Sequence, residues 1–567
     1  MKLVLVVNCF FLLVFSVRVF SQDNPLLLDR YSYSQLEKLM VKYKSDNPLF
    51  PADSKFSRKE VARFISGLPK DRIEDQDMNE IEYWVNENPE WFGDSSFRKS
   101  NLLFEGELSL QEKKPILKYL YKYPSNLLFV EKKDFFLSVN PILHWKLGRQ
   151  ERGRKYIFEN RKGLELRTGI DDKVYIYTSI EDLQFSRPEY IDRYIKNYKS
   201  APGYTFYSGY KADLLGGISG QDVLNSQAYL SVPVGEYISA QFGYGRQFYG
   251  SGMQSLLLSD FGGNYLHLNL EFQIWKMKYQ YMIAEVTQLS NSQDPGDRVL
   301  PKKYIATHFL QFQLGKNAHL GLFESVVFNR QDHLELHYLL PVILFRTVER
   351  TVGSPDNVSL GLDFSWALWN KYKLYSQVIF DEFRISEFFG GNQWWANKYG
   401  VQLGLKAYDI FGIRDMDFSA EYNTVRPYTY SHRDTMATYT HYNSPLAHPS
   451  GANFREYIAT LNYTPFEKWS VSGVIYHIRQ GLDENGINYG ADIRNSYSDN
   501  RPGDYGIETL QGKLTKIYGL QGRISYTLWH NAFLDLNLGL RKQDGNDNFW
   551  GSVSFRLNAK TTGNSIF

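Results

Sequence analysis

Three histidines lie in one polar stretch of the chain and could in principle bind a metal ion. They are His432, His441 and His448. Their spacing matches no zinc pattern, and the only cysteine, Cys9, lies in the apolar N-terminal segment, so no cysteine ligand completes a site. We therefore interpret them as loop histidines that hydrogen-bond locally. We expect no metal and no other cofactor.

Other reactive patterns are weak. The glycine-rich residues 242–252 lack the Gly-Lys-Ser/Thr ending of a phosphate-binding loop, and we interpret them as small strand positions that another element approaches. No Gly-x-Ser-x-Gly sequence marks a nucleophile. A triad built from distant residues stays open, but we predict a protein that is not an enzyme. The net charge of +2 excludes a nucleic-acid footprint.

Side chains that suit sugar recognition stand together in one long predicted loop. Trp394 and Trp395 follow Asn392 and Gln393 directly. Carbohydrate sites need flat aromatic faces for the C–H side of sugar rings and convergent polar groups for the hydroxyls. Tryptophans also anchor membrane proteins at the interface with water, so two interpretations of this pair stay open.

The elements that would position these residues have a period of two. In residues 265–275 the even positions are Leu, Leu, Leu, Phe and Ile, whereas the odd positions are polar or amphipathic. Successive side chains of a strand point to opposite faces, so this segment has one apolar face and one polar face. The same pattern recurs along most of the chain. It predicts an all-β transmembrane fold, a large antiparallel barrel with lipid outside and a polar lumen inside.

The pattern also predicts how many strands the barrel has. We place about nineteen candidates, and we expect about eighteen in the wall because bacterial single-chain barrels have even counts. The candidates lie near residues 102–110, 133–147, 154–170, 172–185, 225–234, 236–248, 263–276, 277–288, 303–315, 317–328, 357–370, 372–384, 398–410, 414–425, 452–465, 467–479, 514–529, 530–542 and 547–558. Long polar joins are expected on one rim only, at 187–222, 287–302, 385–397, 425–451 and 480–513.

Composition agrees with this fold class. Only 43% of the residues are hydrophobic, the mean hydropathy is −0.41, and no apolar run of about 18 residues follows the N-terminus. The aromatic content of 16% suits the aromatic girdles of a barrel. An aromatic-rich soluble β-sandwich array is the alternative.

The N-terminal part is organised differently. Residues 1–21 are predicted to be a secretory signal peptide, cleaved before Gln22. Residues 22–100 predict a small α-helical module, with capping boxes at 34–37 and 57–60 and a third helix over 71–88. The barrel is assigned to residues 101–567. We expect the module on the periplasmic side, either as a plug or cap or as a docking surface for periplasmic partners.

Two segments break the alternation. In residues 338–350, charged side chains such as Arg346 and Glu349 interrupt an apolar run, and charges are costly in lipid. Residues 441–457 contain two prolines, which exclude a central strand. We predict that both segments fold into the lumen and narrow it, with ordinary surface loops as the alternative.

These segments, with an earlier one, resemble the Wzi-type capsule-assembly family. The motifs that carry the resemblance are Tyr249-Gly-Ser-Gly252 with Leu256, Leu257 and Ser259, then Tyr338 and Pro341 leading to Arg346, then Ser354-Pro-Asp-Asn357 with Leu360-Gly-Leu-Asp-Phe364, and finally Pro445-Leu-Ala-His-Pro449 with Gly451-Ala-Asn-Phe454 and Glu456. The resemblance spans roughly residues 100–560, and the layout of signal peptide, helical region and barrel matches as well.

The resemblance implies an eighteen-strand barrel in the cell outer membrane with a periplasmic helical bundle and a lectin-like, non-enzymatic role. Its partners would be surface or capsular polysaccharide, outer-membrane lipid and periplasmic export proteins. The candidate polysaccharide-binding residues are Trp394, Trp395, Arg346, Arg426, His441, His448 and Arg455. Arginines would hold the carboxylates of an anionic capsule bidentately. The motif residues suit packing of the lumen equally well.

Two other functions stay open for the predicted barrel. One is a porin-like transport barrel that passes small solutes, and the other is an outer-membrane scaffold for a secretion or motility machine. A membrane-embedded hydrolase is a further alternative that no motif favours.

Overall fold

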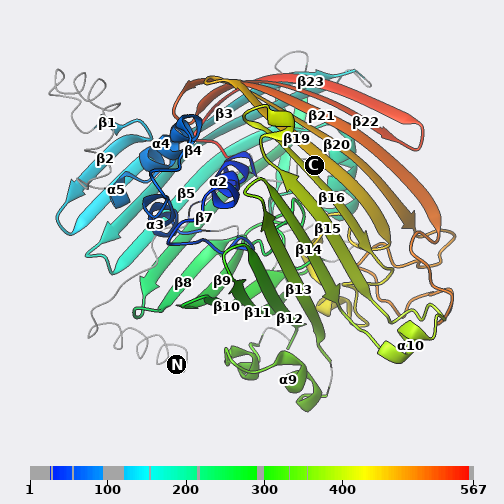
Figure 1. Cartoon of the computed structure of the whole chain (residues 1–567). Coiled ribbons are helices and arrows are strands. Elements are labelled where there is room, and N and C mark those ends of the chain that lie inside the picture. Colours follow the sequence, from blue (N-terminus) through cyan, green and yellow to red (C-terminus); the bar gives the residue numbers. More distant parts are fainter. Residues whose placement is uncertain are drawn as a thin grey trace.

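The computed structural model describes residues 26, 30–53, 56–92, 120–151, 155–212, 217–289, 299–330, 333–353 and 355–560. Within these residues, eighteen antiparallel strands form a closed barrel, and the ring closes where β23 pairs with β3 (Figure 1). The predicted fold class and strand number are therefore confirmed. The predicted signal peptide and the candidate strand at 102–110 lie outside the described residues.

The wall strands follow one another around the ring in chain order. They are β3 (Phe135–Gln150), β4 (Tyr156–Ile170), β5 (Val174–Ser186), β7 (Ile218–Pro233), β8 (Ile238–Gly245), β9 (Tyr265–Ile274), β10 (Met277–Thr287), β11 (Lys302–Leu314), β12 (Ala318–Phe328), β13 (Asn357–Leu368), β14 (Tyr372–Phe380), β15 (Tyr399–Ala407), β16 (Met416–Val425), β19 (Phe454–Phe466), β20 (Trp469–Leu482), β21 (Lys513–Trp529), β22 (Ala532–Gln543) and β23 (Asn546–Leu557). Each corresponds to one candidate from the sequence.

Shorter elements extend or decorate the wall. The strands are β1 (Leu120–Tyr123) and β2 (Asn126–Lys132) beside β3, β6 (Ser208–Ala212) beside β7, and the pair β17 (Thr440–His441) and β18 (Ser444–Pro445). The helices are α2 (Arg30–Lys42), α3 (Arg58–Ser66), η1 (Asp75–Asp77), α4 (Met78–Glu87), α5 (Pro89–Phe92), α8 (Glu189–Tyr198), η5 (Leu336–Leu339), α9 (Phe345–Thr351), α10 (Ile385–Phe389), η6 (Ile410–Gly412) and η7 (Thr435–Ala437). Among the residues that the structure describes, no helix is both long and apolar enough to cross a membrane.

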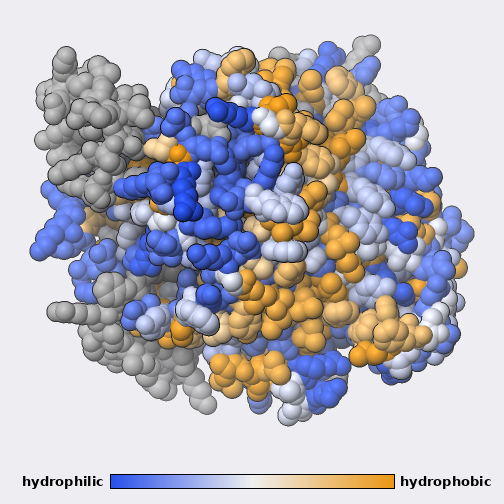
Figure 2. All heavy atoms as spheres, in the orientation of Figure 1, coloured by the Kyte–Doolittle hydropathy of each residue, from blue (hydrophilic) through white to orange (hydrophobic). Residues whose placement is uncertain are grey.

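The strands alternate between an apolar outer face and a polar inner face. On β22, Leu534 and Leu538 are nearly half exposed, whereas Asp535 and Asn537 between them are buried. Because an isolated barrel has nothing but solvent around it, this exposed apolar face is the one that lipid would cover. Figure 2 shows the apolar side chains as a band across the strands, between hydrophilic surface at the two ends.

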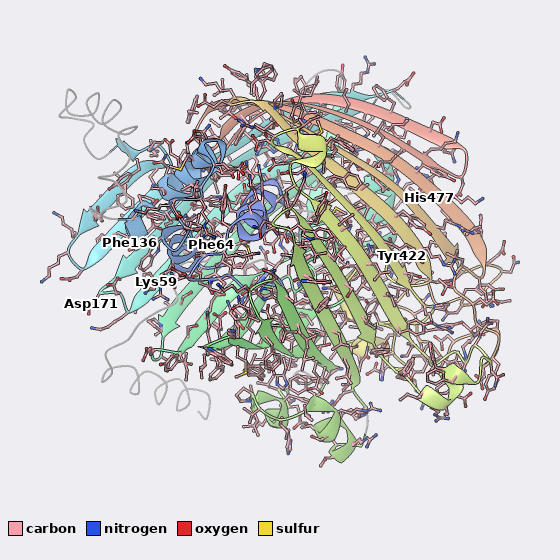
Figure 3. The ribbon with its side chains drawn as sticks, in the orientation of Figure 1. Lys59, Phe64, Phe136, Asp171, Tyr422 and His477 are labelled. Carbon is pink, nitrogen blue, oxygen red and sulfur yellow. The ribbon has the colours of Figure 1, made fainter. Side chains whose placement is uncertain are left out.

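An aromatic row crosses the outer face of four neighbouring strands near the ends that carry the long loops. Its members are Tyr422, Tyr457, His477 and Tyr518, of which Figure 3 labels Tyr422 and His477. The ring centroids of Tyr422 and Tyr457 are 4.9 Å apart, and those of His477 and Tyr518 are 4.2 Å apart. Such a row is typical of the girdle at a membrane interface.

The two rims of the barrel differ. The short-turn rim consists of the connections 171–173, 234–237, 275–276, 315–317, 369–371, 408–415, 467–468 and 530–531. The long-loop rim carries the connections 187–217, 246–264, 288–301, 329–356, 381–398, 426–453 and 483–512, together with the short ones at 151–155 and 544–545. The predicted asymmetry of the joins is therefore present, although strand β7 begins at Ile218, earlier than predicted, and helix α8 occupies part of the first long join.

The helical module comprises α2 to α5 around its own apolar core, which includes Leu36, Val61, Phe64 and Trp84. The capping box at 57–60 is confirmed: the Glu60 N–H donates to Ser57 Oγ at 3.1 Å, and the Ser57 N–H donates to Glu60 Oε2 at 2.7 Å. The capping box at 34–37 is wrong. Helix α2 begins at Arg30, so Ser34 lies inside the helix.

The third predicted helix is shorter than expected. The segment assigned to 71–88 begins with the turn η1 and becomes α-helical only in α4, and the short helix α5 then follows Pro89, a position that proline tolerates at a helix start. The sequence signals therefore located the helical module but misplaced several of its ends.

The helical module lies against the short-turn rim of the barrel (Figure 1), and ion pairs hold it there. Glu37 Oε1 accepts from Lys373 Nζ at 2.6 Å, and Glu37 Oε2 accepts from Lys406 Nζ at 2.5 Å. Lys38 Nζ reaches Asp415 in the turn 408–415 at 2.5 Å. Tyr83 stacks on His530 in the turn 530–531, with 4.8 Å between the ring centroids.

A cluster of four charged residues attaches the module to the barrel at a second place, on the inner face of the wall. The ammonium of Lys278 on β10 lies 2.8 Å from Asp53, 2.9 Å from Glu60 and 3.0 Å from Glu271. All of these side chains except Glu60 are almost fully buried. The module is therefore built into one end of the barrel.

The prediction that residues 338–350 fold into the lumen is wrong, because the segment 334–352 that contains them lies outside the wall. Tyr338, Phe345 and Val348 pack against Tyr281, Ile283, Ala306, Val326 and Phe328, which alternate with the lumen-facing side chains of β10 to β12. Helix α9 therefore lies against the outer face of the wall, below β11 and β12 in Figure 1.

A polar pair on the outer face explains why this segment docks there. His308 Nδ1 and Glu324 Oε2 are 3.3 Å apart on the side of β11 and β12 that otherwise faces lipid. The Arg346 N–H donates to Glu324 Oε1 at 3.2 Å, and Phe345 covers His308 with 3.9 Å between the ring centroids. Since uncovered polar groups are costly in lipid, the segment shields the pair from it.

Candidate functional site

One half of the lumen is filled by chain that enters from the long-loop rim. The loops 246–264 and 426–453 contribute Leu256, Leu257, Leu446 and Ala447 to a buried cluster with inner-face residues of β9 to β16. The second loop contains residues 441–453 of the segment 441–457, so the predicted inward fold is confirmed for these residues, whereas residues 454–457 begin the wall strand β19. The first loop was not predicted to enter the lumen.

The glycines of the first loop allow a close approach to the wall. A Cβ at Gly250, where φ is +142°, would lie 2.0 Å from Gln377 Nε2, and one at Gly252 would lie 2.5 Å from Gln402 Oε1. The interpretation of these glycines as positions for close approach is therefore consistent with the structure. Gly250 and Gly252 lie in an inward loop and not in a strand, whereas Gly243 and Gly245 of the same stretch lie in β8, where the Tyr229 side chain comes close to both.

His441 fastens the second loop to the wall as a neutral ring. The Thr287 N–H donates to His441 Nδ1 at 3.0 Å, and Nε2 lies 3.0 Å from the carbonyl oxygen of Asn264, to which it donates. Burial lowers the pKa of His441 to about 4. Both ring nitrogens are therefore used inside the protein, and the side chain is 2% exposed.

Acid is expected to loosen this loop. The pKa of His441 is lowered from 6.5 to about 4 in the folded state. The stability that the loop gains from a neutral His441 is therefore fully present above pH 6.5 and is lost as the pH falls toward 4, roughly 3 kcal/mol in total. Amide hydrogen exchange in residues 428–452 should accelerate between pH 7 and pH 5 once the intrinsic pH dependence is removed. The His441→Gln variant cannot titrate, so an equal acceleration in that variant would contradict the assignment.

His448 performs a similar task at the next strand. Its Nε2 lies 2.8 Å from Glu456 Oε2, and the same carboxylate oxygen accepts from Asn423 Nδ2 at 2.9 Å. His448 and Glu456 are at most 1% exposed. The structure therefore places His441 and His448 inside the lumen, where each holds the inward loop through hydrogen bonds.

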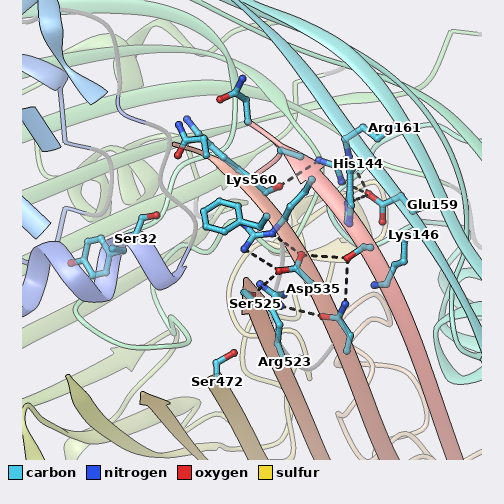
Figure 4. A pocket seen from close by; sticks show the side chains of 18 of the residues that line it. Ser32, His144, Lys146, Glu159, Arg161, Ser472, Arg523, Ser525, Asp535 and Lys560 are labelled. Carbon is cyan, nitrogen blue, oxygen red and sulfur yellow. Dashed lines mark hydrogen bonds and ion pairs between the residues drawn. The ribbon is translucent and has the colours of Figure 1, made fainter. Parts of the chain in front are cut away.

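The other half of the lumen contains a cavity of about 460 Å³. Figure 4 shows its lining from close by. The cavity lies between the inner faces of β3 to β5 and β16 to β23, with Tyr190 of α8 toward the long-loop rim and Tyr83 and Asn531 at the short-turn rim. This lumen cavity was not predicted from the sequence.

Two buried carboxylates, Glu159 and Asp535, form ion pairs with the cationic side chains of the lumen cavity. Glu159 lies 2.9 Å from His144, 2.8 Å from Arg161 and 3.2 Å from Arg187. Asp535 Oδ2 accepts from Arg556 Nε at 2.8 Å. Its second oxygen accepts from Ser525 Oγ at 2.6 Å. Each carboxylate is thus already engaged by at least one guanidinium group.

The long-loop rim brings Trp394, Trp395 and Arg426 together, which are three of the candidate residues named from the sequence. Arg426 Nη2 donates to the carbonyl oxygens of Trp394 at 3.3 Å and of Ile507 at 2.9 Å. This ties the loop 381–398 to the loop 483–512. Both tryptophans stay partly exposed.

Further cations and rings complete this rim cluster. The Arg384 guanidinium lies 4.7 Å from the ring centroid of Trp394, and that of Arg501 lies 3.8 Å from the ring centroid of Trp395. The rings of Tyr497 and Trp395 are 4.9 Å apart. Aromatic faces and guanidinium groups therefore alternate over three loops, which is a surface suited to a polyhydroxylated, anionic ligand.

Arg346 and Arg455 lie away from both the rim cluster and the lumen. Arg346 belongs to α9 on the outer face of the wall, where its Nη1 is 3.0 Å from Glu349. Arg455 is exposed on β19, next to the inward-facing Glu456. Since successive strand residues point to opposite faces, Arg455 must point outward if Glu456 holds His448 inside.

The described residues contain no group of three or more His, Cys, Asp or Glu side chains that could hold a metal ion. His432 lies apart from the other two histidines of its stretch, with its ring 5.8 Å from that of Tyr497.

Comparisons with known proteins identify the fold. No protein-family profile matches the chain, and no curated protein sequence matches it. A similar solved structure is Wzi of Escherichia coli, an outer-membrane protein involved in group 1 capsule assembly and described as a carbohydrate-binding β-barrel. The TM-score is 0.57 at 12% sequence identity, and the match covers 95% of this chain and 100% of that one.

More distant structural matches come from Pseudomonas aeruginosa. OprD has a TM-score of 0.41 at 8% identity over 74% of this chain and 94% of its own. OpdK, solved with vanillate, has a TM-score of 0.42 at 10% identity over 74% of this chain and 98% of its own. At these identities, the likeness to Wzi shows a shared outer-membrane-type barrel fold.

Proposed function

We propose that this protein lies in the outer membrane and binds surface polysaccharide, which it holds at the cell surface as part of capsule assembly or attachment. The observation that carries the proposal is the rim cluster, in which Trp394, Trp395 and three arginines from neighbouring long loops share one surface. The inward loops support it, because they fill half of the lumen and leave little room for a wide channel.

The proposed orientation follows from the two rims. The long-loop rim and its cluster face the outside of the cell, where polysaccharide is found, and the apolar band contacts outer-membrane lipid. The short-turn rim and the helical module face the periplasm, within reach of periplasmic export proteins. No step of this function needs catalysis or a cofactor.

Removing the two tryptophans of the rim cluster is expected to abolish most of the polysaccharide binding. The double variant Trp394→Ala/Trp395→Ala should lose at least about 2 kcal/mol of binding free energy, roughly thirtyfold in affinity, because large aromatic contacts dominate such surfaces. The measurement is retention of the strain's own capsular polysaccharide, or of a glycan array, by the purified full-length barrel.

A matched control is available at the other rim. Trp275 and Trp369 are 86% and 82% exposed in short turns, so Trp275→Ala/Trp369→Ala also removes two tryptophans, but from the proposed periplasmic side. Both variants should keep the heat-modifiable gel migration of a folded barrel. Undiminished polysaccharide retention by the Trp394→Ala/Trp395→Ala variant would refute the rim cluster as the binding surface.

A porin-like role is the second candidate, because the lumen cavity reaches from residues of the long-loop rim to residues of the short-turn rim. A steady single-channel current through the wild-type protein would favour that role.

A further inference from the structure

We propose that the lumen cavity is a second binding site, which takes an acidic sugar and holds its carboxylate with Lys146, Arg187 and Arg523. This site is distinct from the rim cluster, and its assignment rests on the proposed function only in taking the ligand to be a carbohydrate.

The first argument is an excess of cations on one part of the cavity wall. Lys146 of β3 interacts electrostatically with two other cations, Arg187 and Arg523, and with the carboxylates of Glu159 and Asp535. Its ammonium makes no ion pair with the described residues, and it lies 5.8 Å from the ring centroid of Trp550. Figure 4 shows Lys146 and Arg523 directed into the same space.

The second argument is that the nearby carboxylates are already used. Glu159 is shared by Arg161 and Arg187, and Asp535 is held by Arg556. Arg523 donates its Nε–H to Asn537 Oδ1 at 3.2 Å and also interacts electrostatically with Asp535. Lys146, Arg187, Arg523 and Arg556 therefore share the charge of two carboxylates, Glu159 and Asp535. The cations that face this part of the cavity outnumber the anions, and an anion that enters the cavity relieves their repulsion.

The third argument is the neutral part of the lining. Hydroxyl and amide side chains from adjacent strands face the cavity: Ser419, Thr460, Asn462, Ser470, Ser472 and Gln521. Convergent hydroxyl and amide groups can donate to and accept from sugar hydroxyls. The rings of Trp550 and Tyr190 add aromatic surface at the cavity.

The size of the cavity sets the length of the ligand. Small-molecule sites occupy about 300–1,000 Å³, so a cavity of about 460 Å³ takes a short saccharide and not a polymer strand. A fork of guanidinium groups holds a carboxylate through paired hydrogen bonds. A uronic acid, either free or at a chain end, combines both features.

The test is calorimetric titration of the purified full-length protein with D-glucuronate and, separately, with D-glucose. We expect glucuronate to bind at least about tenfold more tightly than glucose, since a charged hydrogen bond contributes about 1.5–3 kcal/mol. Added salt should weaken the binding of glucuronate alone. Equal affinities for the two sugars, or no binding of glucuronate, would overturn the assignment.

Variants locate the site within the barrel. Lys146→Gln and Arg523→Gln should each weaken glucuronate binding about tenfold or more, whereas Lys146→Arg should retain it. Lys162→Gln is the matched control, because Lys162 is exposed on the outer face of β4. If Lys146→Gln keeps its heat-modifiable migration and binds glucuronate as wild type does, the assignment is wrong.

The two proposals fail separately. The Trp394→Ala/Trp395→Ala variant should bind glucuronate as wild type does, because the rim cluster contributes no residue to the lining of the lumen cavity. If the wild type binds glucuronate but retains no polymer, the proposed function falls and the cavity assignment stands. If it retains polymer but ignores glucuronate, only the cavity assignment falls.

Discussion

Glu37→Ala is expected to release the helical module from the barrel. The carboxylate of Glu37 is 1% exposed and is clamped between the ammonium groups of Lys373 and Lys406. Burial would raise the pKa of Glu37, but these two lysines hold it below its ordinary value. Removing the carboxylate leaves two buried ammonium groups without their anion, which costs about 3–5 kcal/mol.

The measurement is amide hydrogen exchange in α2 to α4. A loss of that size should accelerate exchange of the most protected amides about a hundredfold or more, while the gel migration of the barrel stays heat-modifiable. The control is Glu74→Ala, since Glu74 is 54% exposed in its ion pair with Lys42 in the same module and such pairs contribute about 0–1 kcal/mol.

A second variant distinguishes the cost of leaving two buried lysines unpaired from the cost of losing the packed Glu37 side chain. The triple variant Glu37→Met/Lys373→Met/Lys406→Met removes the anion together with both cations, and apolar replacement of a buried ionic group is often neutral or stabilising. It should restore slow exchange in the module. If the triple variant exchanges as fast as Glu37→Ala, the ion pairs are not what holds the module in place.

The wall of the barrel could be predicted from sequence because one simple rule acts on every strand. Lipid requires apolar side chains on one face, and a water-filled or packed polar interior accepts polar ones on the other, so alternation such as that of Leu534 and Asp535 repeats along the chain. An even strand number then follows when both chain ends lie on the same rim.

The position of α9 could not be predicted by the same rule. Charged residues in an apolar run indicate that a segment avoids bare lipid, but they do not tell whether its partner lies inside or outside the wall. The missing information was Glu324, which shares the outer row of β12 with Leu322 and Val326. A carboxylate in an apolar row requires a cover, and this irregularity was visible in the sequence.

The rim cluster and the lumen cavity also differ in how far they could be predicted from the sequence. Trp394, Trp395 and Arg426 belong to predicted long loops of one rim, so their association was within reach of sequence reasoning. The lumen cavity was not, because Arg523 is separated by hundreds of residues from Lys146 and Arg187 and meets them only when β23 pairs with β3. Strand alternation places Lys146 and Arg523 inside the barrel, whereas Arg187 follows the end of β5, and only closure of the ring brings Arg523 to the other two.

Shortening the two inward loops is expected to turn this protein into an open channel. Barrels of 16–18 strands enclose an aqueous channel when nothing fills them. Here the loops 246–264 and 426–453 pack against the inner face of β9 to β16 and leave only the lumen cavity. Replacing residues 247–262 and 428–452 by short Gly-Ser linkers should therefore raise the single-channel conductance in planar bilayers at least about fivefold, with the wild type nearly closed.

A control deletion in another long loop tests whether the two inward loops are what closes the lumen. Removing Asn485 and Gly486, the exposed tip of the long loop 483–512, should leave the conductance of the wild type unchanged, because this tip does not enter the lumen. If instead the wild type already conducts as well as the shortened variant, the inward loops do not close the lumen. The porin-like role would then explain the cavity better than a barrel that holds polysaccharide, because water and ions would already pass along the charged wall of β3, β4 and β21 to β23.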